Sequence, residues 1–86
     1  MAKRTLGSSP TRRTTRPFQR LSRTLGKRVY ELRIARGWTQ RSAAAHIGIG
    51  PAVVRRLETG LANPSLAVLV SVARAFRVPL TRLLGP

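Results

Sequence analysis

The sequence predicts an all-α protein, in which a compact domain of five helices follows a disordered basic N-terminal arm. Three observations lead to this fold class. Apolar residues recur at helical spacing in two segments, residues 21–32 and 66–76. Between these segments, two short stretches begin and end on residues that start and stop helices. The chain of 86 residues has room for one small core and no second one.

The charge of the chain favours polyanionic partners. Seventeen Lys and Arg residues stand against two acidic residues, which gives a formal net charge of +15. Nucleic acid fits this charge first, an anionic membrane second and an acidic protein third. The chain has no cysteine, which excludes disulfides, thiolate catalysis and Cys-based zinc sites. No apolar run approaches the roughly 20 residues that span a bilayer. We therefore expect a cytoplasmic, nucleoid-associated protein without a membrane contact, metal or cofactor.

Residues 1–22 form the predicted flexible arm, and residues 23–86 form the predicted domain. The stretch 1–23 carries seven positive charges, two prolines and no acidic residue. It offers little apolar material to a core, which is typical of a disordered segment. Two roles stay open for this arm. Its arginines could contact a nucleic-acid backbone or minor groove, or it could be a solubilising tail without fixed contacts.

The first helix of the domain is expected to begin near Ser22 or Thr24 and to end at Gly37. Its apolar side is formed by Leu21, Leu25, Val29 and Leu32. These residues repeat at four, four and three positions, which places them on one face of a helix.

Two short helices with a tight turn between them are expected over residues 39–60. Thr39 can cap the first helix with its hydroxyl, and Gly48 can end it because a left-handed residue is least costly without a β-carbon. Pro51 suits the first position of the second helix, which stops before Gly60. The side chains that should form a shared core are Ala44, Ile47, Ile49, Val54 and Leu57.

One set of residues in this region falls in the register of a known family. The set comprises Gln40, Ala44, Gly48, Ile49, Val54, Leu57, Glu58 and Gly60, followed by Asn63-Pro64-Ser65. In these positions the chain resembles the phage-repressor-like (Cro/C1, or xenobiotic-response-element) helix-turn-helix family, from about residue 25 to residue 84. The resemblance implies a lambda-repressor-like fold and a small transcriptional regulator, of repressor type, that binds specific sequences of double-stranded DNA.

The resemblance also assigns contacts with DNA phosphates. The first helix of the pair approaches the backbone with its N-terminus, so Gln40 is the expected phosphate clamp, with Thr39 and Arg41 beside it. The loop after the second helix also approaches the backbone in this family. Thr59 and Asn63 are therefore secondary phosphate candidates, and stabilisation of the turn before proline is the alternative role of Asn63.

Base readout is expected from the second helix, at the positions that face the major groove in the family. These positions hold Pro51, Ala52, Arg55 and Arg56. Pro51 and Ala52 offer no side-chain hydrogen bond, only apolar contact such as that with a thymine methyl. Readout then depends on Arg55 and Arg56, which predicts a half-site that contains G/C pairs. The alternative is that one of these arginines contacts only phosphate.

The two carboxylates of the chain, Glu31 and Glu58, are expected in different roles. In the resembled family an arginine of the first helix pairs with the glutamate that ends the recognition helix, and Arg33 and Glu58 hold these positions. We expect this pair to orient the helices rather than to add net stability. Glu31 should make weak pairs within its helix, with Arg28 among the candidates.

Two further helices complete the predicted domain. Ser65 can cap a helix with an apolar stripe of Leu66, Leu69, Val70, Ala73 and Phe76. A short helix is expected over residues 79–84. A homodimer would form through these helices four and five or through the arm, and Leu83 and Leu84 are the residues to test. Completion of the monomer core is the alternative role for both.

No nucleophile, acid pair or phosphate-cradling glycine loop indicates an enzyme. Within the regulator class, the antitoxin of a toxin–antitoxin pair is an open variant, with the toxin as a protein partner. Two alternatives come from other classes. A protein-interaction adapter fits the missing donors at Pro51 and Ala52, and a sequence-independent nucleic-acid-binding protein fits the basic arm.

Overall fold

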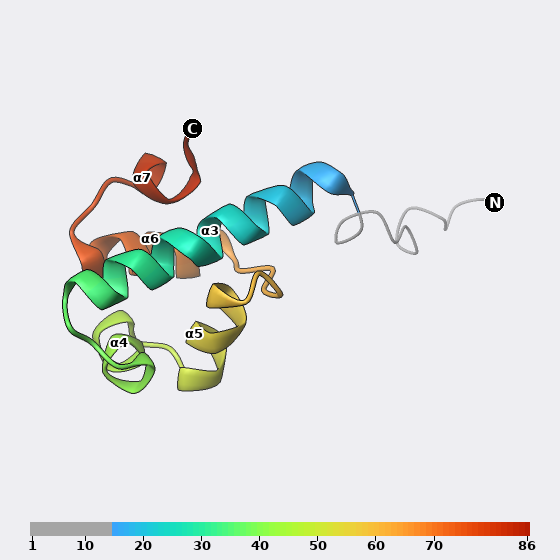
Figure 1. The fold of residues 1–86 in the computed structure, drawn as a ribbon. Coiled ribbons are helices and arrows are strands. Elements are labelled where there is room, and N and C mark those ends of the chain that lie inside the picture. The colour runs from blue at the N-terminus through green and yellow to red at the C-terminus, as the bar shows by residue number, and fades with distance from the viewer. Residues whose placement is uncertain (1–14) are drawn as a thin grey trace.

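The structure is a computed structural model that describes residues 15–86, and this part of the chain forms five helices and no strand. The helices are α3 (Arg16–Ala35), α4 (Gln40–Ile47), α5 (Pro51–Glu58), α6 (Leu66–Phe76) and α7 (Leu80–Leu84). The long α3 crosses the domain, with α4 and α5 on one side and α7 on the other (Figure 1). The predicted all-α, five-helix fold is confirmed. None of these helices is both long and apolar enough to cross a membrane.

The predicted start of the first helix, near Ser22 or Thr24, is wrong, because α3 begins at Arg16. Thr15 caps this end, since its Oγ1 accepts a hydrogen bond from the backbone N–H of Phe18 at 3.4 Å. A proline in the first turn adds to the helix start, where no amide partner is needed. A cap and a proline therefore begin the helix ahead of the apolar repeat.

The early start of α3 changes the boundary of the predicted arm. Residues 16–22 belong to α3, whereas residues 1–14 lie outside the described residues and the arm there stays a prediction. Within α3, Leu21 is exposed rather than part of the core. Ser22 is buried instead, and its hydroxyl donates to the carbonyl of Ala62 at 3.4 Å. A long-range contact thus fixes the N-terminal half of the helix.

The helix ends predicted for the central pair are confirmed. The Oγ1 of Thr39 accepts a hydrogen bond from the backbone N–H of Ser42 at 3.0 Å, which caps α4. Gly48 ends α4 in the left-handed region with a φ of 90°, and Pro51 opens α5. Gly60, with a φ of 76°, follows the end of α5. These local signals place α4 and α5 as a helix-turn-helix pair.

The core lies between all five helices, and its largest fully buried side chains are Val29, Val54, Leu57, Val72, Phe76 and Leu83. The stripe predicted for the fourth helix is partly wrong, because Leu66 and Val70 are exposed. The inward side of α6 consists of Leu69, Val72, Ala73 and Phe76. These residues follow a spacing of three and four, so Leu66 and Val70 fall on the neighbouring, outward face.

A stack of aromatic rings joins α4 to the core. The indole of Trp38 is half-buried. Its ring lies 3.9 Å from that of His46 and 5.3 Å from that of Phe76. The carbonyl of Trp38 also accepts a hydrogen bond from Nη1 of Arg33 at 2.9 Å. The connection between α3 and α4 is thereby fixed at the point where α4 begins.

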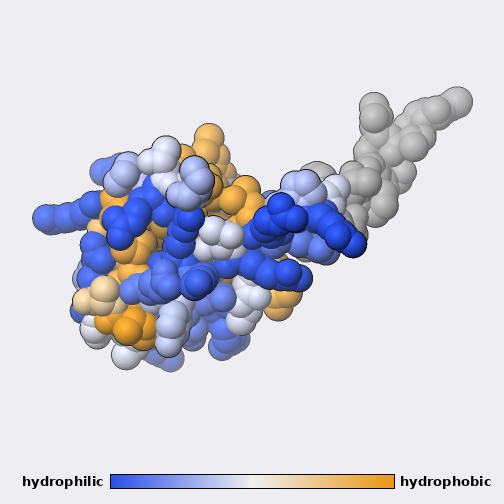
Figure 2. Space-filling model, turned by 45° about the horizontal axis from the view of Figure 1, so that its top comes forward, coloured by the Kyte–Doolittle hydropathy of each residue, from blue (hydrophilic) through white to orange (hydrophobic). Residues whose placement is uncertain are grey.

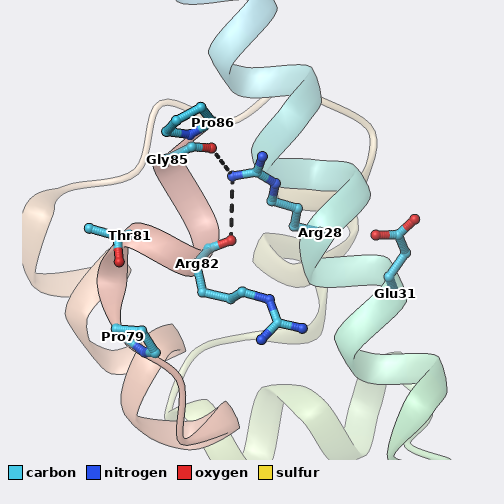
Figure 3. A pocket seen from close by; sticks show the side chains of 7 residues that line it. All are labelled: Arg28, Glu31, Pro79, Thr81, Arg82, Gly85 and Pro86. Carbon is cyan, nitrogen blue, oxygen red and sulfur yellow. Dashed lines mark hydrogen bonds between the residues drawn. The ribbon is translucent and has the colours of Figure 1, made fainter.

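Arg28 holds the C-terminus against α3. Its Nη1 donates to the carbonyl of Gly85 and, at 3.4 Å, to that of Arg82, and Figure 3 shows its guanidinium turned toward both. The expected pairing of Arg28 with Glu31 is therefore wrong, because the carbonyls at the C-terminus take the guanidinium. Leu83 of α7 is fully buried, so it completes the monomer core.

Candidate nucleic-acid interface

A glycine in α3 sets the position of α5. A β-carbon at Gly26 would lie 2.3 Å from the carbonyl oxygen of Leu57 and 2.9 Å from that of Glu58. Only the absence of a side chain allows the two backbones to approach so closely. Because Val54 and Leu57 are buried against the core, the opposite face of α5 points outward.

The outward face of α5 holds all four residues predicted to read bases: Pro51, Ala52, Arg55 and Arg56 are exposed. Val53 is also exposed on this helix, and the prediction did not include it. Its place beside Pro51 and Ala52, on a helix with a base-reading face, is the signal that could have indicated it. The face thus combines an apolar N-terminal part with two neighbouring guanidinium groups.

Three side chains connect α3, α4 and α5. Arg33 and Glu58 form a two-point ion pair, from Nε to Oε2 at 2.6 Å and from Nη2 to Oε1 at 3.0 Å. Their side chains are only 11% and 6% exposed, so water screens the pair little. The hydrogen bond with Glu58 raises the pKa of the Arg33 guanidinium above its ordinary value. The two-point contact holds the end of α5 against α3.

Glu58 also reaches the predicted phosphate clamp. The Nε2 of Gln40 donates to Oε1 of Glu58 at 3.1 Å. A side-chain amide has two N–H donors, so this hydrogen bond orients the group and leaves the second donor for another acceptor. Arg41 follows on α4 and is exposed. The first turn of α4, with the positive end of the helix dipole, lies at the same place.

Thr59 and Asn63, the two predicted phosphate contacts after α5, differ in how accessible their hydrogen-bond donors are. The hydroxyl of Thr59 donates to the carbonyls of Arg55 and Arg56 at 3.0 and 3.1 Å. A phosphate contact by Thr59 would have to replace these hydrogen bonds. Asn63 is exposed in the following loop, so its amide is accessible to a ligand.

The exposed charged groups on this face of α4 and α5 are all positive. The chain has only two carboxylates, and Glu58 is buried in the ion pair while Glu31 lies on α3. The exposed groups of α4 and α5 therefore present Arg41, Arg55 and Arg56 without an acid between them. Such a surface attracts a polyanion. Among residues 15–86, no cluster of three or more His, Cys, Asp or Glu residues could hold a metal ion.

Comparison with known proteins agrees with this geometry. A family model described as helix-turn-helix matches residues 29–83. None of the curated proteins matches the chain. A similar solved structure is that of the restriction-modification controller protein C.AhdI from Aeromonas hydrophila. It is 31% identical, with a TM-score of 0.69, over 72% of this chain and 94% of that one. The chain belongs to the Cro/C1-type helix-turn-helix family of DNA-binding transcription regulators.

Proposed function

We propose that this protein is a repressor-type regulator that reads a specific DNA sequence with Arg55 and Arg56. The observation that carries the proposal is the exposed face of α5, where both arginines lie opposite the buried Val54 and Leu57. A recognition helix in the major groove presents such a face to base edges. Arginine most often reads guanine through O6 and N7, so the half-site should contain G/C pairs.

The phosphate contacts of this proposal centre on α4. Gln40, held by Glu58, donates its second N–H to a phosphate, and Arg41 and Thr39 contribute from the same turn. On the other side of the groove, Asn63 approaches the backbone, with Thr59 as a weaker contact. Pro51 and Ala52 line the groove through apolar contact. In this scheme α4 fixes the register and α5 reads the bases. The protein would act on the chromosome in the cytoplasm.

We further propose that the regulator binds as a homodimer through α6 and α7. Leu66 and Val70 are large apolar side chains, one helical turn apart and exposed on the same face of α6. Leu84 is half-buried on α7, whereas Leu83 belongs to the core.

Sedimentation tests this interface. We expect Val70→Asp to give a monomer. The control Ile34→Asp places the same charge on the exposed surface of α3 and should leave the dimer intact. If Val70→Asp remained a dimer like the control, this interface would be excluded.

The likeness to a controller protein suggests a second candidate. This chain would then regulate a neighbouring pair of restriction and modification genes, as the name of C.AhdI indicates for that protein. The antitoxin variant of the same class would bind a toxin protein as well as DNA. The reading frames beside the gene distinguish these roles, because a nuclease with a methyltransferase or a small toxin would adjoin it.

Selection from a random duplex pool tests the central proposal. The full chain would be incubated with the pool at about 150 mM salt, near physiological ionic strength, and bound fragments would be sequenced. We expect an enriched site with G/C pairs. Replacing a base-reading arginine, as in Arg55→Gln or Arg56→Gln, should cost about 1–3 kcal/mol of binding and relax one position of the site.

The matched control is Arg74→Gln, which removes the same charge from an exposed position on α6; because α6 belongs to the proposed dimer interface, sedimentation should first show that this variant has the mass of the wild type. It should keep both the site and its affinity. If both α5 variants weakened all sequences equally, the arginines would contact only phosphate. If the wild-type chain enriched no site, sequence-specific regulation would be refuted. The adapter or the sequence-independent binder would then remain.

A further inference from the structure

The projecting N-terminal end of α3 carries a stripe of positive charge. Arg16, Arg20, Arg23 and Lys27, named here the basic stripe, are all exposed. Their spacing of four, three and four places them on one face of the helix. Figure 2 shows hydrophilic side chains over this end of α3, next to the grey residues. In Figure 1, the same end extends past α5.

Among residues 15–86, the basic stripe forms no salt bridge, and the nearest carboxylate along α3 is Glu31, one turn after Lys27. Like charges at spacings of three and four repel one another on a helix surface. The first turn of α3 holds no acidic residue, and cations near a helix N-terminus oppose its dipole. The salt bridge between Arg33 and Glu58 is the only one among residues 15–86. A helix built this way gains stability when an anionic surface lies along it.

The basic stripe begins where the DNA-facing surface of α5 ends. A β-carbon at Gly60, directly after α5, would lie 3.2 Å from Cγ and 3.4 Å from Cα of Arg23. Arg23 therefore packs against the turn that leaves the recognition helix. From Arg23 back to Arg16, the stripe runs for about 10 Å along the helix axis. A duplex carries about six phosphates over that length.

We propose that the basic stripe binds the phosphates that flank the half-site read by α5. This inference rests on the proposed function, because α5 must lie in the groove for the stripe to reach the flanking backbone. The occupant is double-stranded DNA, since the stripe continues a DNA-facing surface and has the opposite charge to the phosphate backbone. The first turns of α3 thus add affinity and extend the contacted site without reading sequence.

The test compares two double variants that remove the same charge. Arg16→Gln/Arg20→Gln neutralises the outer end of the stripe and leaves Arg23, which packs against Gly60, in place. Arg74→Gln/Arg82→Gln is the control on α6 and α7; because these helices belong to the proposed dimer interface, sedimentation should first show that it has the mass of the wild type. Binding of a random-sequence duplex of about 30 base pairs, three helical turns, would be measured over a range of salt concentrations.

The stripe variant should lower the slope of log affinity against log salt by about two and weaken binding at 0.15 M salt about tenfold or more. The control should match wild type in both. An unchanged slope in the stripe variant would overturn the proposal. The selected site then separates the two proposals: adding about 10 flanking base pairs, one helical turn, should strengthen binding of wild type but not of the stripe variant. Equal gains would refute the flanking contact and leave readout by Arg55 and Arg56 intact.

Discussion

At the scale of single residues, Glu58 has the widest influence, because it accepts hydrogen bonds from Arg33 on α3 and Gln40 on α4. One carboxylate thus couples the packing of α5 to the orientation of a phosphate-binding amide. A residue with both functions should affect stability and DNA binding together.

The variant Glu58→Gln tests this coupling. Removing one partner of a buried ion pair leaves the other charge uncompensated, so thermal unfolding should show a loss of about 3 kcal/mol. Below the unfolding transition, DNA affinity should fall about tenfold, the equivalent of one hydrogen bond of about 1.4 kcal/mol. Glu31→Gln is the control, since it removes the same charge from an exposed side chain and should change stability by less than about 0.5 kcal/mol. Equal behaviour of the two variants would argue against the coupling.

At the scale of the helices, the crossing of α3 and α5 depends on Gly26. Alanine usually stabilises a helix interior by about 1 kcal/mol over glycine. Here the new methyl group would meet two backbone carbonyls of α5, so Gly26→Ala should instead destabilise the fold by about 3 kcal/mol. In chemical denaturation, Gly50→Ala should cost no more than about 1 kcal/mol, because nothing lies within 4 Å of a β-carbon there. A stabilised Gly26→Ala protein would contradict the close crossing.

The end of α6 offers a change of opposite sign. Arg77 ends this helix with a φ of 57°, the only positive φ among the non-glycine residues of 15–86. Arg77→Gly relieves this backbone strain and should raise stability by about 0.5 kcal/mol, or roughly 2–4 °C in Tm. Arg74→Gly, within the same helix, should lower stability by about 1 kcal/mol. A Tm reduced in both variants would show that the left-handed cap is not strained.

The helix pair α4 and α5 could be predicted from sequence because its signals are local. Thr39, Gly48 and Pro51 each act within a few residues of their own position. The start of α3 could not, because a high charge with few apolar residues favours disorder by composition. Two long-range contacts help to hold this part of the helix. They join Ser22 to Ala62 and Arg23 to Gly60, each across about 40 residues of sequence.

The predicted apolar stripe of α6 was wrong only at Leu66 and Val70, for a related reason. Its sequence, LAVLVSVARAF, is apolar nearly all round, so periodicity does not distinguish the inward from the outward face. For the candidate site, family resemblance indicated the ion pair of Arg33 with Glu58 and the exposed arginines of α5. The hydrogen bond from Gln40 to Glu58 required the packed arrangement of three helices, and no spacing in the chain indicates it.

At the scale of the whole molecule, repulsion among the positive charges opposes folding into a compact domain. Folding brings most of the 17 positive charges together around a small core, with only two carboxylates to offset them. The unfolded chain spreads the same charges over a larger volume. Self-repulsion therefore lowers the stability of the free protein, and the surface that causes it is the one that attracts DNA.

The effect of this repulsion on stability should appear as a dependence of Tm on salt concentration in the absence of DNA. The Debye length falls from about 30 Å at 0.01 M to about 8 Å at 0.15 M, so added sodium chloride screens the repulsion. We expect Tm to rise by about 5 °C across this range, which corresponds to about 1 kcal/mol. Arg16→Gln/Arg20→Gln lowers the net charge from +15 to +13 and should show a smaller rise. A Tm that fell with salt would instead mean that attraction within the Arg33–Glu58 pair outweighs the repulsion among all the other charges.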